Sequence, residues 1–293
     1  MDFLRALGFL TILPCPRLES TPEDLGRSSG WFPLAGVLLG ALLAAAHAGL
    51  ALLVSPPAAA SLTVVLWAFL TRGLHLDGLA DTFDGIGGGY SRESRLAIMK
   101  DSRLGTFGGI AVASALLLKA TLLAGTERTA ALQALFLAPV LGRWAILFAM
   151  RFFPSARPGG MGDLFRKGCT NRCLFTGTAA ALLLSAAAGG LTSFLLLPLV
   201  SLFALLISRW LAFLLGGLTG DSYGTVCELS ELLSLFLFAS LRLLLSLRKS
   251  RPSGFHDCAP ERAPVQERWS HRPGRHRVFG IVKSAKHIKI IES

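Results

Sequence analysis

The sequence predicts an all-α polytopic membrane protein with about six to seven transmembrane helices. Of its 293 residues, 52% are hydrophobic and only 16% are charged, whereas soluble domains carry about 25% charge. Several apolar runs approach the ~20 residues needed to cross the hydrocarbon core of a bilayer. The candidate spans are residues 31–54, 58–70, 108–123, 130–153, 175–194, 196–215 and 232–247.

The amino-terminal segment, residues 1–13, is predicted to form an amphipathic helix at the membrane interface. Its positive charge at Arg5 follows Asp2, and no long apolar run leads to a small-residue cleavage site. This pattern does not fit a cleavable signal peptide. The Pro56-Pro57 pair then makes the clearest break between the first two candidate spans.

Three long polar segments separate the spans: residues 72–107, 154–174 and 216–231. The first two are rich in Lys and Arg, so the positive-inside rule places them in the cytoplasm. An even number of crossings between the segments puts all three on that side. The sequence therefore predicts active-site loops on the cytoplasmic face, as expected of a membrane enzyme with cytosolic substrates.

Three carboxylates lie in the first polar segment. Asp77, Asp81 and Asp84 stand at i, i+4 and i+7, within roughly 60° of one helix face at about 100° per residue. Carboxylates crowded at a membrane edge repel one another unless a cation neutralises them. A hard divalent cation with oxygen ligands is the natural partner; the alternative is a solvated acidic helix start.

The polar segments also contain candidate anion-binding groups. Lys100 and Arg103 precede a glycine-rich start of the next span and suit phosphate oxygens, or else anionic lipid. Arg157 is flanked by Pro and Gly, which indicates either a fixed guanidinium for an anion or an ordinary interfacial turn.

Other charged residues lie at or within the spans. Asp221, between Gly220 and Ser222, is placed to act as a metal ligand or a base, whereas Glu228 suits a helix amino terminus. Arg143 and Arg209 fall inside apolar runs. They either extend to the interface or face a polar interior where an anion binds. The five cysteines show neither zinc-ligand spacing nor a disulfide framework.

Several of these motifs occur together, in order and over about residues 1–245. They lie at residues 3–14, 30–36, 75–85, 95–108, 156–162 and 217–231. In this combination the sequence resembles the cobalamin synthase family, the adenosylcobinamide-GDP ribazoletransferases. The resemblance implies the final step of coenzyme B12 assembly, in which an activated corrin ring is joined to the lower-ligand nucleoside in the bacterial inner membrane with Mg²⁺.

The resemblance implies adenosylcobinamide-GDP and α-ribazole, or α-ribazole 5′-phosphate, as substrates and GMP as the released product. Membrane lipid is the other expected partner, nucleic acid is not expected, and a homo-oligomer is compatible with the sequence. Phosphoryl transfer depends mainly on charge neutralisation and positioning. We therefore expect Mg²⁺ ligands at Asp77, Asp81 and Asp84, phosphate contacts at Lys100, Arg103 and Arg157, a ligand or base at Asp221, and either proton transfer or a structural role at His75.

The chain is predicted to divide into a membrane-embedded transferase domain, residues 1–247, and a basic tail, residues 248–293. The tail carries eleven Lys or Arg against four acidic residues and has no apolar period, which is typical of disorder. If residues 232–247 cross the membrane fully, the tail would emerge outside, against the positive-inside rule.

Two alternative functions fit parts of the pattern. CDP-alcohol phosphotransferases also place an Asp-Gly motif on a membrane helix, but here Ala80 comes one residue early and the downstream acidic motif is absent. A polytopic transporter would explain the spans. However, it would place carboxylates near mid-membrane, on broken helices, rather than at one edge.

Overall fold

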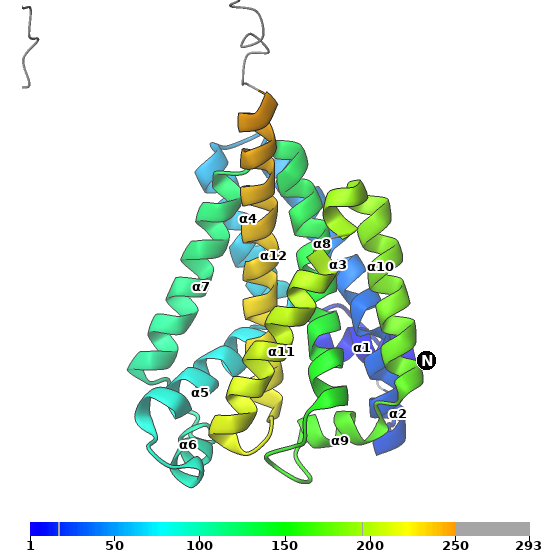
Figure 1. Ribbon diagram of the computed structural model, residues 1–293, viewed down its shortest axis with the longest axis vertical. Helices are drawn as coiled ribbons and strands as arrows, with labels where there is room; N and C mark the ends of the chain where they lie inside the picture. Colours follow the sequence, from blue (N-terminus) through cyan, green and yellow to red (C-terminus); the bar gives the residue numbers. More distant parts are fainter. Residues whose placement is uncertain (17, 195, 250–293) are drawn as a thin grey trace, which may run out of the picture. The chain divides into compact units, whose positions relative to one another are not determined.

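The computed structural model describes residues 1–16, 18–194 and 196–249, which form α-helices joined by short loops (Figure 1). The elements are α1 (Asp2–Leu10), α2 (Pro22–Ser28), a 3-10 turn (Ser29–Trp31), α3 (Phe32–Leu50), α4 (Pro56–Leu70), α5 (Leu74–Gly88), α6 (Arg92–Ile98), α7 (Thr106–Ala124), α8 (Arg128–Phe152), α9 (Met161–Gly168), α10 (Asn171–Phe194), α11 (Leu196–Leu215) and α12 (Gly220–Lys249). No strand occurs in these described ranges.

The all-α polytopic membrane class is confirmed. Four helices in the described part of the chain are long and apolar enough to cross a membrane: Pro22–Leu50, Thr106–Ala124, Arg128–Phe152 and Leu196–Leu215. A fifth crossing is added if α4 and α5 together form one broken span. By this measure the number of spans is below the expected six to seven, although α10 and α12 cover the remaining candidate runs as long helices.

A sharp bend of 88° separates α4 from α5. Arg72 and Gly73 both take left-handed backbone conformations there, with φ of 53° and 65°. That conformation is unfavourable for a non-glycine residue. The Arg72 guanidinium is held by donating to the carbonyls of Gly8 and Phe9, both at 3.1 Å, at the end of α1. The sequence assigns α4 to a candidate span and α5 to the first polar segment, so the bend lies at the boundary between the two.

Helix α8 lies at the centre of the bundle and packs against α3, α10, α11 and α12. Most of its side chains are buried. Its approach to α3 is close because the contact surface carries glycines. A Cβ atom on Gly40 would lie 2.3 Å from the Phe136 carbonyl oxygen. Small residues that let backbones approach are the usual means of packing helices inside a membrane.

The three polar segments converge at one end of the bundle, the lower end in Figure 1, where α5, α6, α9 and the turn into α12 lie. The loop before α9 is tied to the loop before α12, because the Ala156 amide donates to the Leu218 carbonyl at 2.9 Å and the Leu218 amide to the Pro154 carbonyl at 2.8 Å. Gly217 has φ of 146°, and a Cβ there would lie 2.7 Å from the Ala156 nitrogen. Only glycine fits this contact.

The predicted amino-terminal helix is present as α1 and buries Ala6, Leu7 and Leu10. The predicted tail begins within the last turns of α12, and residues 250–293 lie outside the described part of the chain. The division into a transferase domain and a basic tail therefore stays a prediction.

Candidate functional site

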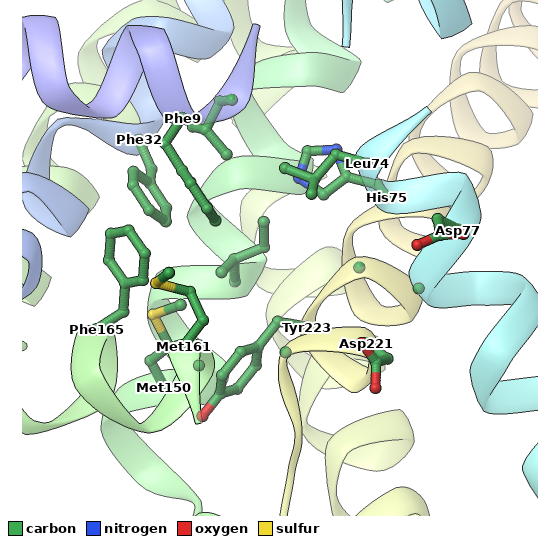
Figure 2. Close-up of a pocket in the computed structure, with 16 residues that line it drawn as sticks. Phe9, Phe32, Leu74, His75, Asp77, Met150, Met161, Phe165, Asp221 and Tyr223 are labelled. Carbon is green, nitrogen blue, oxygen red and sulfur yellow. The ribbon is translucent and has the colours of Figure 1, made fainter. Parts of the chain in front are cut away.

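A cavity of ≈ 190 Å³ lies where α1, α3, α5, α8, α9 and α12 meet (Figure 2). One side is apolar and aromatic, and the other carries carboxylates. The lining residues are Phe9, Leu10, Phe32, Leu74, His75, Asp77, Gly78, Ile146, Met150, Met161, Gly162, Phe165, Gly220, Asp221, Tyr223 and Gly224.

The apolar wall is built by three phenylalanines from three helices. The ring of Phe165 lies 4.6 Å from that of Phe9 and 5.6 Å from that of Phe32, measured between centroids. Met150 and Met161 continue this wall (Figure 2). Tilted aromatic rings at these distances attract one another, so the three side chains form one continuous aromatic wall.

The opposite side of the cavity carries Asp77 from α5 and Asp221 from α12 (Figure 2). The two helices touch closely there, because a Cβ on Gly78 would lie 2.7 Å from the Asp221 carbonyl oxygen. Asp81 lies one turn further along α5 and is close enough to be repelled electrostatically by Asp77, Asp221 and Asp84. The structure therefore brings the carboxylates of two distant sequence segments together.

Crowding and burial change the acidity of these groups. Burial, followed by the charges of neighbouring carboxylates, raises the pKa of Asp81 to about 6. Burial also raises the pKa of Asp221, although the Arg157 guanidinium opposes this shift. Both shifts mean that the negatively charged forms are less favoured than in a free aspartate, so a nearby cation would stabilise them. Carboxylates with raised pKa values that line a cavity are typical of functional sites.

Asp84 differs from the other two aspartates of α5 in its contacts. It is buried, and its two carboxylate oxygens accept hydrogen bonds from the amides of Gly105 and Gly108, both at 2.8 Å. These amides belong to the start of α7, so Asp84 caps that helix and ties α5 to α7. Its expected role as a metal ligand stays a prediction.

The carboxylate group suits a hard cation, but not a closed protein cage. Within the described residues, no three His, Cys, Asp or Glu side chains are grouped closely enough to hold a metal ion by themselves. Mg²⁺ is commonly bound through only one or two carboxylates, with water and substrate phosphate completing its shell. One or two of the carboxylates of Asp77, Asp81 and Asp221 would fit that open type of site.

The predicted phosphate-binding residues fall in two different places. Arg157 lies beside the cavity edge, where it donates to Asp221 at 3.1 Å and to the Leu96 carbonyl at 2.9 Å. Its Nε is buried and makes no hydrogen bond in the described structure. Lys100 and Arg103 are exposed, do not line the cavity, and Arg103 pairs with Asp101 at 2.6 Å. Their phosphate contacts stay predictions.

His75, at the first turn of α5, lines the same cavity and is 2% exposed. Its Nδ1 faces the guanidinium of Arg143 at 3.3 Å, while its Nε2 is buried and has no hydrogen-bond partner in the described structure. Thus one ring nitrogen of His75, Nδ1, is hydrogen-bonded, and the other, Nε2, is unpaired in the described structure. Figure 2 shows its ring between the aromatic wall and Asp77.

A network of buried charges lies between α7, α8 and α12. Lys119 contacts Glu228 at 2.8 Å and Glu231 at 2.5 Å, and Arg143 pairs with Glu231. All four side chains are at most 4% exposed. Two positive and two negative charges balance, which is the condition for keeping charge inside a membrane protein. The anion that Arg143 meets is therefore Glu231 of the same chain.

Sequence reasoning missed Lys119, Glu231 and Tyr223. The signal for the first two was present, since Lys119 is the only charged residue of the run 108–123, and Glu231 precedes another apolar run. Opposite charges next to apolar runs indicate ion pairs across helices. Tyr223 lines the cavity with a buried hydroxyl that lacks a hydrogen-bond partner among the described residues. No local sequence signal marks it.

The fold and the site define a polytopic α-helical membrane protein with a small ligand cavity that is aromatic on one side and acidic on the other. Comparison with known proteins assigns the family. The sequence model described as cobalamin-5-phosphate synthase matches residues 2–239, and this chain belongs to that family.

Curated relatives agree with this assignment. The adenosylcobinamide-GDP ribazoletransferase of Roseiflexus sp. (strain RS-1) is 45% identical over 243 residues, covering 82% of this chain and 90% of the relative. That of Herpetosiphon aurantiacus is 41% identical over 80% of this chain and 95% of the relative. The Brevibacillus brevis protein of the same name is 37% identical over an alignment that covers 78% of this chain and 94% of the relative. No solved structure matches this chain significantly.

Proposed function

We propose that this protein is an adenosylcobinamide-GDP ribazoletransferase that acts in the last step of coenzyme B12 synthesis. The observation that carries the proposal is the match to relatives of that name over nearly their whole length, 90% for the Roseiflexus protein and 95% for that of Herpetosiphon. We place it in the bacterial inner membrane, with the cavity end facing the cytoplasm. Because the chain belongs to this family, we favour this function over a CDP-alcohol phosphotransferase or a transporter.

In the proposed reaction, a hydroxyl oxygen of α-ribazole or its 5′-phosphate attacks the cobinamide-linked phosphorus of adenosylcobinamide-GDP. A new oxygen–phosphorus bond forms, and the pyrophosphate bond breaks. GMP leaves with the bonding electron pair, and the hydroxyl proton passes to a base. The product is adenosylcobalamin, or its 5′-phosphate. Little covalent participation by the protein is needed, since positioning and charge neutralisation account for most of the catalysis of phosphoryl transfer.

The residues at the acidic edge of the cavity support these needs. One or two of the carboxylates of Asp77, Asp81 and Asp221 would hold Mg²⁺, with water and substrate phosphate as its other ligands. Bound Mg²⁺ would neutralise negative charge on phosphate oxygens. Arg157 lies next to Asp221 and has an unpaired Nε–H, so it would donate to a phosphate oxygen. Asp221 has a raised pKa and is also the candidate to receive the hydroxyl proton.

The proposal is tested with the full chain purified in detergent or inserted in liposomes. We expect GMP release from adenosylcobinamide-GDP only when both α-ribazole and Mg²⁺ are added, with a cobalamin product detected in equal amount. A chain carrying Arg157→Ala should show slower release at the same level of inserted protein. The absence of GMP release from correctly inserted wild-type protein would reject the proposed function.

A further inference from the structure

The contacts of His75 define which of its ring nitrogens carries the proton. A guanidinium can only donate hydrogen bonds, so the Nδ1 that faces Arg143 at 3.3 Å is an acceptor. The proton of the neutral ring therefore lies on Nε2. Arg143 cannot turn away easily, because it is also paired with Glu231 deep between the helices. The buried charge network thus acts through Arg143 to hold the His75 ring with its Nε2–H free.

The unpaired Nε2–H of His75 restricts which ligands can fill the cavity favourably. His75 is 2% exposed and lines the cavity, and its Nε2 has no partner within the described structure. A buried donor without an acceptor is costly. A ligand that fills the cavity is therefore favoured if it brings an acceptor to Nε2, presents apolar surface to Phe9, Phe32 and Phe165, and offers a polar group to the Tyr223 hydroxyl, which is also unpaired among the described residues. A flat aromatic heterocycle with one unprotonated ring nitrogen meets the first two conditions, and a hydroxyl of an attached sugar would meet the third.

Other parts of the two substrates fit this cavity less well. The corrin ring is far larger than ≈ 190 Å³. Guanine would fit by size, but it carries several donors and acceptors along its edges, and the apolar wall would leave most of them unpaired. A lipid chain would match the wall and leave the His75 donor unpaired. The base of the acceptor nucleoside is the remaining group.

We propose that the cavity binds the heteroaromatic base of the acceptor nucleoside, with the His75 Nε2–H donating to the unsubstituted ring nitrogen of that base. This inference rests on the proposed function. With the base against the aromatic wall, the ribose lies toward Asp77 and Asp221 on the opposite side of the cavity (Figure 2). The acceptor hydroxyl is then directed to the carboxylates that would hold the metal and the phosphates.

The test compares two acceptors that differ by one atom: the α-ribosides of benzimidazole and of indole, in which a C–H replaces the ring nitrogen. We expect wild-type protein to use the benzimidazole riboside with a kcat/KM roughly tenfold higher, since one buried hydrogen bond is lost with indole. In His75→Phe, the value for benzimidazole should fall to that for indole, while the KM for adenosylcobinamide-GDP stays unchanged.

A matched control is available in His47. It is also a buried histidine, but it lies on α3, bonds to Thr63 at 2.9 Å and does not line the cavity. His47→Phe should keep the tenfold preference for the benzimidazole riboside. If His75→Phe lowers the rates with both acceptors equally, His75 serves the reaction in another way, such as proton transfer, and the base-binding proposal is overturned.

A second variant keeps the proposal testable if His75→Phe fails to insert. Met150→Ala widens the apolar wall without touching His75 and should raise the relative kcat/KM for a base with added methyl groups, by about fourfold per methyl. An unchanged base preference would contradict the proposal.

A binding measurement separates this proposal from the proposed function. Equilibrium dialysis with benzimidazole α-riboside should show binding to wild-type protein that is weakened roughly tenfold for the indole riboside. If wild-type protein binds the nucleoside with this preference but releases no GMP, the proposed function fails and the base pocket stands. If GMP is released without any base preference, the base pocket fails and the function stands.

Discussion

The buried charge network and the acidic cavity edge share one helix, α12, but their charged side chains lie in opposite surroundings. In the network, Lys119 and Arg143 balance Glu228 and Glu231, and all four are almost fully buried. At the edge, Arg157 pairs with Asp221 and acts electrostatically on Asp81, and the charge of Asp77 acts on both of these carboxylates.

This difference separates structural from ligand-binding charge. A balanced buried pair stabilises the contact between helices only while both partners remain, because a single charge left in a low-dielectric interior is strongly unfavourable. An unbalanced group that is partly open to solvent costs less without its ligand and gains most when a cation binds. His75 joins the two regions, since Arg143 of the network faces its Nδ1 and the cavity lies on its other side.

The largest effect is expected from breaking the network. Glu231→Ala removes the carboxylate that pairs with Arg143 and one of the two carboxylates that pair with Lys119. It should cost about 3–5 kcal/mol of stability, measured by thermal unfolding in detergent. The control removes one whole pair, Lys119→Met with Glu228→Met, and leaves Arg143 paired with Glu231. It should lose much less. Equal losses in the two proteins would show that the balance of charge does not matter.

A large effect on turnover, without a loss of stability, is expected at the cavity edge. Asp77→Asn keeps the size of the side chain but removes a charge that holds a hard cation, so GMP release should fall on the order of 10²-fold. Because Asp77 is exposed, the melting temperature should hardly change. Glu93→Gln, an exposed change on α6 away from the cavity lining, is the control. Wild-type turnover in Asp77→Asn would remove Asp77 from the site.

Variants of Asp84 test whether this residue acts as a structural charge or as a ligand-binding charge. Its bonds to the Gly105 and Gly108 amides predict that Asp84→Ala destabilises the protein by about 1–2 kcal/mol, the usual cost of losing a helix cap. The Mg²⁺ concentration for half-maximal activity should change less than in Asp77→Asn. A shift as large as that of Asp77→Asn would make Asp84 a metal ligand as well as a cap.

The smallest effect concerns pH. Burial and the neighbouring carboxylates raise the pKa of Asp81 to about 6 from the ordinary 3.8, so folding favours its protonated form. Without divalent cations, the contribution of Asp81 to the free energy of unfolding should therefore be greatest below pH 3.8. It should decline as the pH rises through about 6. The melting temperature in chelator should show this decline, and Asp81→Asn should remove it. Added Mg²⁺ should stabilise the protein more at pH 7 than at pH 5, since protons compete for the carboxylate.

Much of the architecture followed from local pattern. The apolar runs predicted the long helices, and the amphipathic start predicted α1. The polar segments predicted which loops meet at one end of the bundle, and Asp77, Arg157 and Asp221 do lie together there. These features depend on composition and on the 3.6-residue period, which a single sequence displays directly. Lys100 and Arg103, which the sequence predicts to contact phosphate, do not line the cavity.

What the tertiary structure alone decided depends on contacts between residues far apart in the chain. Glu231 lies 112 positions from Lys119 and 88 from Arg143, and Arg143 lies 68 positions from His75. Asp84 caps a helix that begins about twenty residues later. No local period encodes such pairings, because they arise only when helix packing sets the distance and direction between side chains. The sequence by itself therefore determined which groups carry charge, and the packing of α5, α7, α8 and α12 decided which of them are neutralised and which remain free to bind a ligand.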